Sequence, residues 1–212
     1  MNSLSCLKAK IVQMEDLLLK SGLDKIAEFD DFTDERDGRY YLTVKIKGIT
    51  WMAENLKYAG KNNDIGVCYD GKPENGDKYG RLYDFETAKK ACPIGWNLPC
   101  KKEWEKLINF FGSPDSKDLK ATLGWNSNRT NAGTDTAGTD TADDTLGFAA
   151  LPGGYCDSNG VFHDLGRIGY WWSNCGNSGN AYRLGIFYTY SDIPYIDSDK
   201  NYLYSVRCVK DD

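Results

Sequence analysis

The chain has 212 residues, a formal net charge of −5 and a mean hydropathy of −0.57. These values fit one domain with a short appendage. They argue against a nucleic-acid-binding protein, because phosphate binding needs clustered Lys and Arg. No apolar run is long enough to cross a membrane, so we predict no membrane span. No signal peptide is visible either, so we expect a cytoplasmic protein or one whose leader preceded this sequence.

The first segment of the chain is predicted to form a helix over residues 3–20. Apolar residues recur there at alternating spacings of three and four: Leu4, Leu7, Ile11, Met14 and Leu18. The pattern is too short to indicate a coiled coil, so the helix either packs on its own domain or mediates self-association. The acidic residues 30–38 are predicted to be a linker. The expected division is therefore 1–36 for the helix and linker, and 37–212 for the main domain.

Within the main domain, residues 40–46 alternate between apolar and polar and predict a half-buried strand, with a second strand at Trp51. Residues 64–77 are rich in Gly, Asn and Asp and predict a loop. Two short helices are expected at 84–91 and 101–111, the second with Glu103 as its capping-box acid. The last third, 155–212, reads as a meandering antiparallel sheet, so we predict an α+β domain with long loops.

An acidic repeat interrupts the middle of the domain. Residues 133–137 are repeated immediately as 138–142, which predicts a surface loop. The repeat and the residues after it carry four carboxylates that could attract calcium: Asp135, Asp140, Asp143 and Asp144. Their spacing matches no calcium-binding loop, so we predict an acidic loop without a bound ion.

Catalytic and metal-binding motifs are sparse. His163 is the single histidine and is expected on a loop, and no two cysteines have the spacing of a structural zinc site. The sequence contains neither a nucleophile elbow nor a phosphate-binding glycine loop. We therefore expect no metal, no cofactor and no enzymatic activity.

Six short segments rich in Trp, Gly, Cys and Pro follow one another in a fixed order. They are Trp51–Leu56, Lys78–Tyr83, Ala91–Pro99, Gly147–Gly154, Gly169–Ser173 and Ser205–Asp211. This series resembles the Fibrobacter succinogenes major paralogous domain, a bacterial surface-protein module similar to the C-type lectin fold. The resemblance extends over residues 37–211. It implies a C-type lectin-like fold with two short helices and a twisted antiparallel sheet, to which the N-terminal helix is added.

The resemblance also carries expectations for the cysteines. Cys92 and Cys208 occupy the positions of the long disulfide of C-type lectin-like domains, although two buried thiols are the alternative. Cys68 looks like half of a second family pair, but its usual partner would fall near Gly76, where this chain has no cysteine. Cys156 and Cys175 flank the two central tryptophans and are a further candidate pair that the sequence does not favour.

Residues 174–204 are rich in Tyr, Asn, Ser and Gly, the composition that is typical of antibody binding loops. The candidate ligand-binding residues are Asn174, Asn177, Asn180, Arg183, Phe187, Tyr188, Tyr190, Asp192, Tyr195, Asp197 and Tyr202. Along the strand that starts near Ala181, Leu184 and Ile186 should face one side, and Arg183 and Phe187 the other. Ordinary loop and edge-strand composition is the alternative explanation.

The segment is similar to the terminal region of variable proteins from diversity-generating retroelements. This similarity implies a non-enzymatic binding module, extracellular or at the cell surface, for a protein or a surface-polymer or carbohydrate ligand. A structural or adhesive surface protein is the first alternative. An enzyme is the second, because Val206–Val209 is similar to the terminal strand of formylglycine-generating enzymes. Cys175 lacks the sequence setting of the reactive cysteines in those enzymes.

Overall fold

The computed structural model describes residues 27–110, 116–126, 144, 146–188 and 193–211. Three sequence-based predictions lie outside the described residues: the helix over 3–20, the tandem acidic repeat, and the roles of Tyr190 and Asp192.

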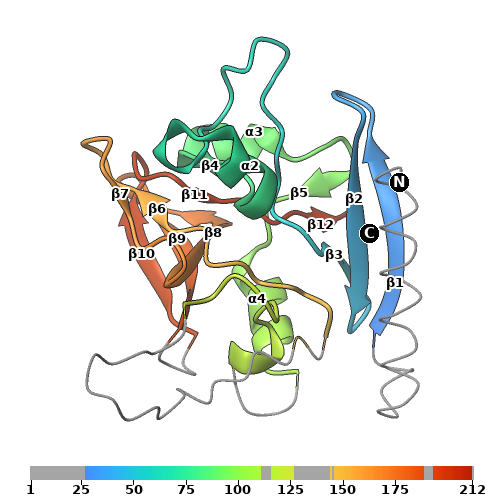
Figure 1. Cartoon of the computed structure of the whole chain (residues 1–212). Helices are drawn as coiled ribbons and strands as arrows, with labels where there is room; N and C mark the ends of the chain where they lie inside the picture. Colours follow the sequence, from blue (N-terminus) through green and yellow to red (C-terminus); the bar gives the residue numbers. More distant parts are fainter. Residues whose placement is uncertain (1–26, 111–115, 127–143, 145, 189–192, 212) are drawn as a thin grey trace, which may run out of the picture.

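The described part of the chain is a mixed α+β domain built on two five-stranded sheets (Figure 1). The first sheet has the order β1 (Ala27–Asp34), β2 (Arg39–Ile46), β3 (Ile49–Met52), β12 (Val209–Lys210) and β5 (Trp96–Asn97). The second has the order β10 (Tyr195–Asp199), β9 (Asn180–Phe187), β8 (Ile168–Gly176), β11 (Tyr204–Ser205) and β4 (Leu82–Tyr83). Named strands pair antiparallel, except for the parallel pair β8 and β11.

A small ribbon of β6 (Tyr155–Cys156) and β7 (Phe162–His163) lies beside the second sheet. The helices are α2 (Pro73–Tyr79), α3 (Phe85–Ala91) and α4 (Lys101–Ile108), with 3-10 turns at Tyr69–Gly71 and Ser116–Asp118. In Figure 1 the helices lie between the two sheets, with α2 and α3 at one end and α4 at the other. The strands near 40–46 and at Trp51 and the two predicted helices are confirmed.

The prediction of an acidic linker over residues 30–38 is wrong for residues 30–34, which belong to β1 and pair with β2. The reason lies in two aromatic side chains. Phe29 packs against the core cluster that contains Trp51, and the ring of Phe32 stacks on Trp96 with centroids 4.5 Å apart. The acidic side chains lie on an edge strand, where charges are common because they oppose pairing with another chain.

The prediction of a loop over residues 64–77 is also incomplete, because α2 begins at Pro73. Proline is favoured in the first turn of a helix, where its missing N–H costs no hydrogen bond. The helix ends at Gly80, whose φ of 81° is readily adopted only by glycine. The glycines and asparagines of this region masked a short helix whose start and stop signals were both present.

The core is assembled from a few large aromatic rings. Trp51 lies 4.8 Å from Trp104 and 5.6 Å from Phe148, and Phe148 lies 6.4 Å from Trp171, all between ring centroids. All four side chains are buried. Tilted and edge-to-face contacts of this kind add about 0.5–1.5 kcal/mol per pair beyond the burial of apolar area.

A fully buried arginine lies at the centre of this core. Arg207 donates to the Oδ1 atom of Asn55 at 3.1 and 2.8 Å and to the carbonyl of Met52 at 3.2 Å. It also donates to the carbonyls of Phe148 and Ala149. Burial lowers the pKa of Arg207 to about 9, although the Glu54 and Asp144 carboxylates act in the opposite direction. Arg207 therefore joins three segments that are far apart in the sequence.

Asp144 is the described member of the acidic group that could have attracted calcium, and it serves another role. Its Oδ1 atom accepts the backbone N–H of Ala149 at 2.7 Å. Burial raises the pKa of Asp144 to about 7, and the hydrogen bond from Ala149 and the charge of Arg207 only partly offset this effect. The folded state therefore favours the protonated carboxyl more than the unfolded state does.

This shift predicts a specific pH dependence. Because the folded pKa is raised, the contribution of Asp144 to stability is greatest below pH 4 and is lost as the pH rises through about 7. We expect Asp144→Asn to stabilise the protein relative to wild type at pH 8 but not at pH 4.5. Asparagine keeps the acceptor oxygen and tolerates the φ of 42° at this position. Urea denaturation at both pH values measures the difference, with exposed Asp64→Asn as control. A difference between variant and wild type that is independent of pH would contradict the prediction.

Candidate functional site

Six side chains on and beside the second sheet form what we call the aromatic face. They are Tyr155, Tyr170, Arg183, Phe187, Tyr202 and Tyr204. The ring of Tyr155 lies 5.5 Å from Tyr170, 6.1 Å from Tyr202 and 5.9 Å from Tyr204 between centroids. Phe187 lies 5.9 Å from Tyr170 in an edge-to-face contact. Four members are half-buried, while Tyr170 and Tyr204 are buried beneath them.

Arg183 is the charged centre of the aromatic face. Its guanidinium carbon lies 3.8 Å from the ring centroid of Tyr170 and 5.3 Å from that of Tyr204. Its Nε and Nη1 atoms are buried and have no hydrogen-bond partner among the described residues. The cation is therefore compensated chiefly by ring faces, an interaction worth about 2 kcal/mol or more when it is desolvated.

The hydroxyls of Tyr155, Tyr170 and Tyr204 remain protonated at neutral pH, because their pKa values are raised. Burial raises the pKa of Tyr204 to about 12, and Arg183 offsets only part of this effect. Burial likewise raises the pKa values of Tyr155 and Tyr170. These hydroxyls can therefore both donate and accept hydrogen bonds. The face combines apolar ring area, neutral hydroxyls and one cation.

The predicted alternation of faces along β9 is confirmed. Leu184 and Ile186 are buried in the core cluster, whereas Arg183 and Phe187 point to the aromatic face. Of the predicted binding residues, Arg183, Phe187 and Tyr202 are therefore brought together. Tyr188 accepts a hydrogen bond from Arg167 at 3.2 Å just beyond the end of β9.

Tyr195 lies apart from the aromatic face. It is paired with Leu184 across the β9–β10 ladder, and its ring stacks on Tyr182 with centroids 5.1 Å apart. Its hydroxyl bonds to Ser173 Oγ at 2.9 Å. Burial raises the pKa of Tyr195. These contacts make Tyr195 part of the packing between β8, β9 and β10.

Asn177 and Asn180 lie at the turn between β8 and β9, at the opposite end of β9 from Phe187, whereas Asn174 lies in β8 and Asp197 in β10. Asn177 Oδ1 accepts the backbone N–H groups of Gly179 at 3.0 Å and Asn180 at 2.7 Å. Asn180 Nδ2 donates to Asp197 at 2.8 Å. Asn174 is exposed, and its backbone N–H is bonded to the carbonyl of Pro99. The side chains of Asn177, Asn180 and Asp197 hold the turn in place and do not join the aromatic face.

Three members of the aromatic face were absent from the predicted set: Tyr155, Tyr170 and Tyr204. Tyr155 and Tyr170 precede the segment of binding-loop composition, so composition alone could not include them. Tyr204 follows Tyr202 at a spacing of two residues, and this spacing in the sequence could have identified Tyr204 as a member of the aromatic face. His163, expected on a loop, lies in β7, stacks on Tyr155 at 4.9 Å and contacts Asp157 at 3.0 Å.

The cysteines follow the resemblance for one pair. Cys92 and Cys208 form the expected disulfide, with Cα atoms 6.0 Å apart. Cys156 and Cys175, the candidate pair that the sequence did not favour, are both free. Cys156 is buried in a small cluster with Tyr69, Leu82 and their neighbours, whereas Cys175 lies near the end of β8. Although Cys156 and Cys175 flank Trp171 and Trp172 in the sequence, the fold does not bring the two thiols together.

Cys68 faces Gly76, as the resemblance implies for a second bridge. A β-carbon placed at Gly76 would lie 3.5 Å from that of Cys68 and would collide with its Sγ atom. Because 3.5 Å is within the range for bridged cysteines, we expect Gly76→Cys to form a disulfide with Cys68. Closing this loop of about eight residues should stabilise the protein by about 2–3 kcal/mol.

Peptide mass mapping without reductant identifies the new bridge, and urea denaturation with and without reductant measures its effect. Gly76→Ala is the matched control. We expect it to be destabilising, because its methyl group meets the Cys68 sulfur without bonding to it. Two free thiols in the oxidised Gly76→Cys protein would contradict the prediction.

The described residues contain neither a membrane-spanning helix nor a metal-binding cluster. None of their helices is long and apolar enough to cross a membrane. Nor do these residues include a group of three or more His, Cys, Asp or Glu side chains placed to hold a metal ion.

Comparison with known proteins gives one match. The family model of the Fibrobacter succinogenes major domain matches residues 44–210. No curated protein and no solved structure matches the chain. The match starts within β2 and ends in β12, so it includes the helices, the disulfide and the aromatic face.

Proposed function

Because the chain belongs to the Fibrobacter succinogenes major domain family, we propose that it is a non-enzymatic binding module with a C-type lectin-like fold. The observation that carries this proposal is the aromatic face, where half-buried rings surround a cation that has no carboxylate partner among the described residues. A buried guanidinium N–H without an acceptor costs free energy, and a ligand that brings an acceptor to it would remove this cost. Ring faces, hydroxyls and a guanidinium group are the combination that binding loops use.

The chemistry of the aromatic face favours a carbohydrate or a protein segment as ligand. The ring of Tyr155 is stacked on His163 and on Tyr202, and Tyr202 and Phe187 remain partly exposed beside it. Partly exposed rings offer apolar area to the faces of sugar rings or to apolar side chains. Neighbouring hydroxyls can bond to the polar edges of the same ligand.

Two features support the proposed fold and location. The disulfide joins the residue after α3 to the terminal region of the chain, as the lectin-like resemblance requires. Disulfides persist in oxidising environments, which favours a location outside the cell or at its surface.

The proposal is tested by measuring binding to a glycan array and a peptide-display library. Phe187→Ala and Tyr202→Ala should each weaken the ligand that is found by about tenfold or more, as expected for hot-spot aromatic residues. Ile94→Ala is the control, because Ile94 is 97% exposed on a loop outside the face. Tyr202→Phe separates the role of the ring from that of the hydroxyl.

Thermal melts confirm that the variants fold. A wild-type protein that binds nothing in either library would favour a structural or adhesive role. A ligand whose affinity is unchanged in both alanine variants would show that another surface binds it.

A further inference from the structure

A separate cavity of about 380 Å³ lies between the β1–β2 hairpin, the segment that follows β3, and α2. Its lining includes three cations and one carboxylate: Arg39, Lys57, Arg81 and Asp77. Asn63 and the free thiol of Cys68 line the same cavity. None of the six residues of the aromatic face belongs to this lining. The volume is within the range of small-molecule sites.

Arg81 is held on one wall by neutral acceptors. Its Nε atom donates to the carbonyl of Ile65 at 2.9 Å, and Nη2 donates to that of Gly66 at 2.7 Å. Nη1 donates to Asn63 Oδ1 at 3.0 Å and lies 3.5 Å from Cys68 Sγ. These bonds fix the guanidinium but do not neutralise it. In the described part of the chain, no ion pair of Arg81 with a carboxylate is found.

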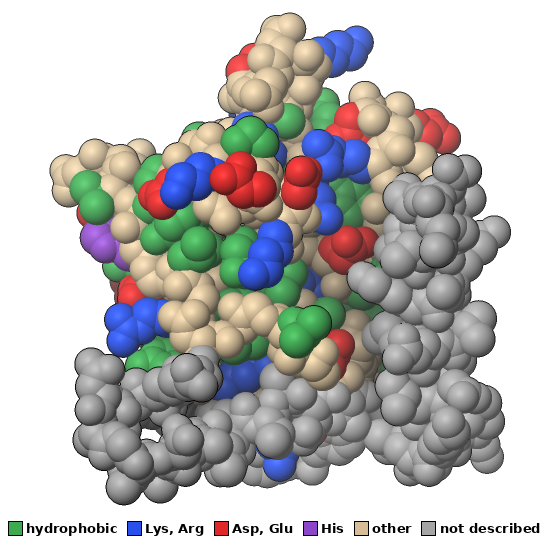
Figure 2. Space-filling model, viewed as in Figure 1, with side chains coloured by type: hydrophobic (Ala, Val, Ile, Leu, Met, Phe, Trp, Pro, Cys, Tyr) green, Lys and Arg blue, Asp and Glu red, His purple; other side chains and the backbone are tan. Residues whose placement is uncertain are grey.

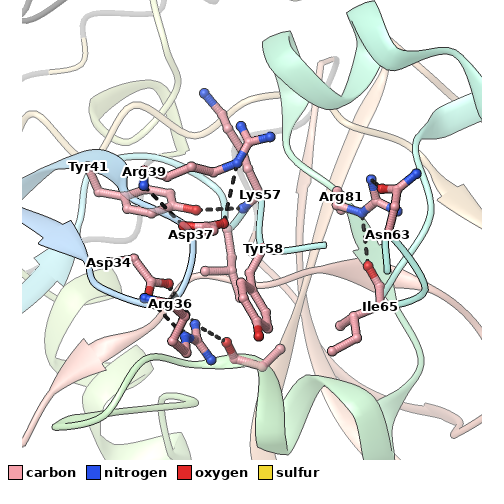
Figure 3. Close-up of polar contacts among 12 residues, drawn as sticks. Asp34, Arg36, Asp37, Arg39, Tyr41, Lys57, Tyr58, Asn63, Ile65 and Arg81 are labelled. Carbon is pink, nitrogen blue, oxygen red and sulfur yellow. Dashed lines mark hydrogen bonds and ion pairs between the residues drawn. The ribbon is translucent and has the colours of Figure 1, made fainter. Parts of the chain in front are cut away.

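The other two cations come from the opposite wall. Figure 3 shows Arg39 and Lys57 close together, with Arg81 and Asn63 across from them. Arg39 lies 3.4 Å from Asp37, and Lys57 lies 3.4 Å from Glu54. Both pairs are longer than tight ion pairs and partly exposed, so they hold their cations only weakly. Either cation can turn toward a ligand without losing a strong contact.

The balance of charge at the cavity is opposite to that of the whole chain. Three cations and one carboxylate face it, although the chain as a whole carries −5. The fixed Arg81 guanidinium supplies positive charge, whereas Arg39 and Lys57 can turn their N–H donors toward an oxyanion, which arginine binds through paired donors. We infer that this cavity binds a small ligand that bears an oxyanion, such as a carboxylate, sulfate or phosphate group.

Cys68 makes the cavity accessible to a kinetic test. An attacking thiolate forms a mixed disulfide with an aromatic disulfide reagent and releases the other half of the reagent as a thiolate. We compare the dianionic reagent 5,5′-dithiobis(2-nitrobenzoate) with the neutral reagent 4,4′-dithiodipyridine, and follow Cys68 by peptide mass mapping. If the cavity attracts anions, the ratio of the anionic to the neutral rate at Cys68 should fall about tenfold in Arg39→Gln/Lys57→Gln.

Lys45→Gln is the matched control, because Lys45 also pairs with a carboxylate, Glu28, at 3.2 Å, but outside the cavity. The ratio should be unchanged in this variant. Sulfate should lower the wild-type ratio more than chloride does at equal ionic strength. An equal ratio in wild type and the double variant would overturn the inference.

Direct binding then identifies the oxyanion. Calorimetric titrations with inorganic sulfate, inorganic phosphate and glucuronate should show saturable binding of at least one of them to wild type, and its loss in Arg39→Gln/Lys57→Gln. Phe187→Ala should leave this binding intact, so failure of the aromatic face and failure of the cavity are distinguishable. Absence of saturable binding for all three ions would overturn the inference.

Discussion

Replacing Asn55 with alanine is expected to lower the free energy of unfolding by about 3 kcal/mol or more, because a buried donor left without its acceptor costs about 1–3 kcal/mol and a charged donor costs more. Asn55 Oδ1 accepts from Trp171 Nε1 at 2.8 Å and from two nitrogens of Arg207. Its Nδ2 atom donates to the carbonyl of Tyr79 at 2.7 Å. Alanine would leave the guanidinium of Arg207 and the indole N–H of Trp171 without this acceptor. Both side chains are buried, so water does not replace the lost hydrogen bonds.

Urea denaturation followed by tryptophan fluorescence measures this loss. Asn109→Ala is the matched control, because the side chain of exposed Asn109 also bonds to a carbonyl, that of Glu105, at 3.0 Å. Its effect should be about 0.5 kcal/mol or less, as for most surface substitutions. Equal losses in the two variants would show that water enters the core and bonds to Arg207 in place of Asn55.

Local signals in the sequence predicted the elements that depend on neighbouring residues. The alternation over 40–46 identified β2, and the helix that begins at Lys101 has the predicted cap, since Cys100 N–H donates to Glu103 at 2.6 Å. The strand β1 was missed because its sequence is acidic. Its stability comes from the packing of Phe32 on Trp96 and of Phe29 on the core cluster that contains Trp51. Strand propensity is a poor guide where tertiary contacts decide.

Apart from the Cys92–Cys208 disulfide, which the family resemblance implied, features that join distant segments could not be predicted from the sequence. Arg207 and Asn55 are separated by 152 positions, and nothing local indicates that they meet in the core. The aromatic face was only partly predicted, because Tyr155 and Tyr170 come from segments that precede the tyrosine-rich region. The cavity shows the same limitation. No sequence pattern links Arg39, Lys57 and Arg81, and only the fold places them on facing walls.

Removing the disulfide with Cys92→Ala and Cys208→Ala is expected to lower the free energy of unfolding by about 4–5 kcal/mol. The sequence separation is 116 residues, and closing so long a loop restricts the unfolded chain strongly. Urea denaturation of wild type with and without reductant gives the same comparison without a change of side-chain volume. Reduced and oxidised wild type of equal stability would contradict the prediction.

A double-mutant cycle decides where the disulfide acts. Cys208 follows Arg207 directly, and its carbonyl accepts the N–H of Met52 at 3.0 Å, so the bridge lies beside the Asn55 network. If the disulfide stabilises by restricting the unfolded chain, its loss and Asn55→Ala should add to within about 0.5 kcal/mol. If it acts by holding Arg207 in place, the two losses should overlap by more than that amount. The chain-entropy argument predicts the additive result, because Cys208 remains paired to Met52 through the backbone when the sulfur atoms are removed.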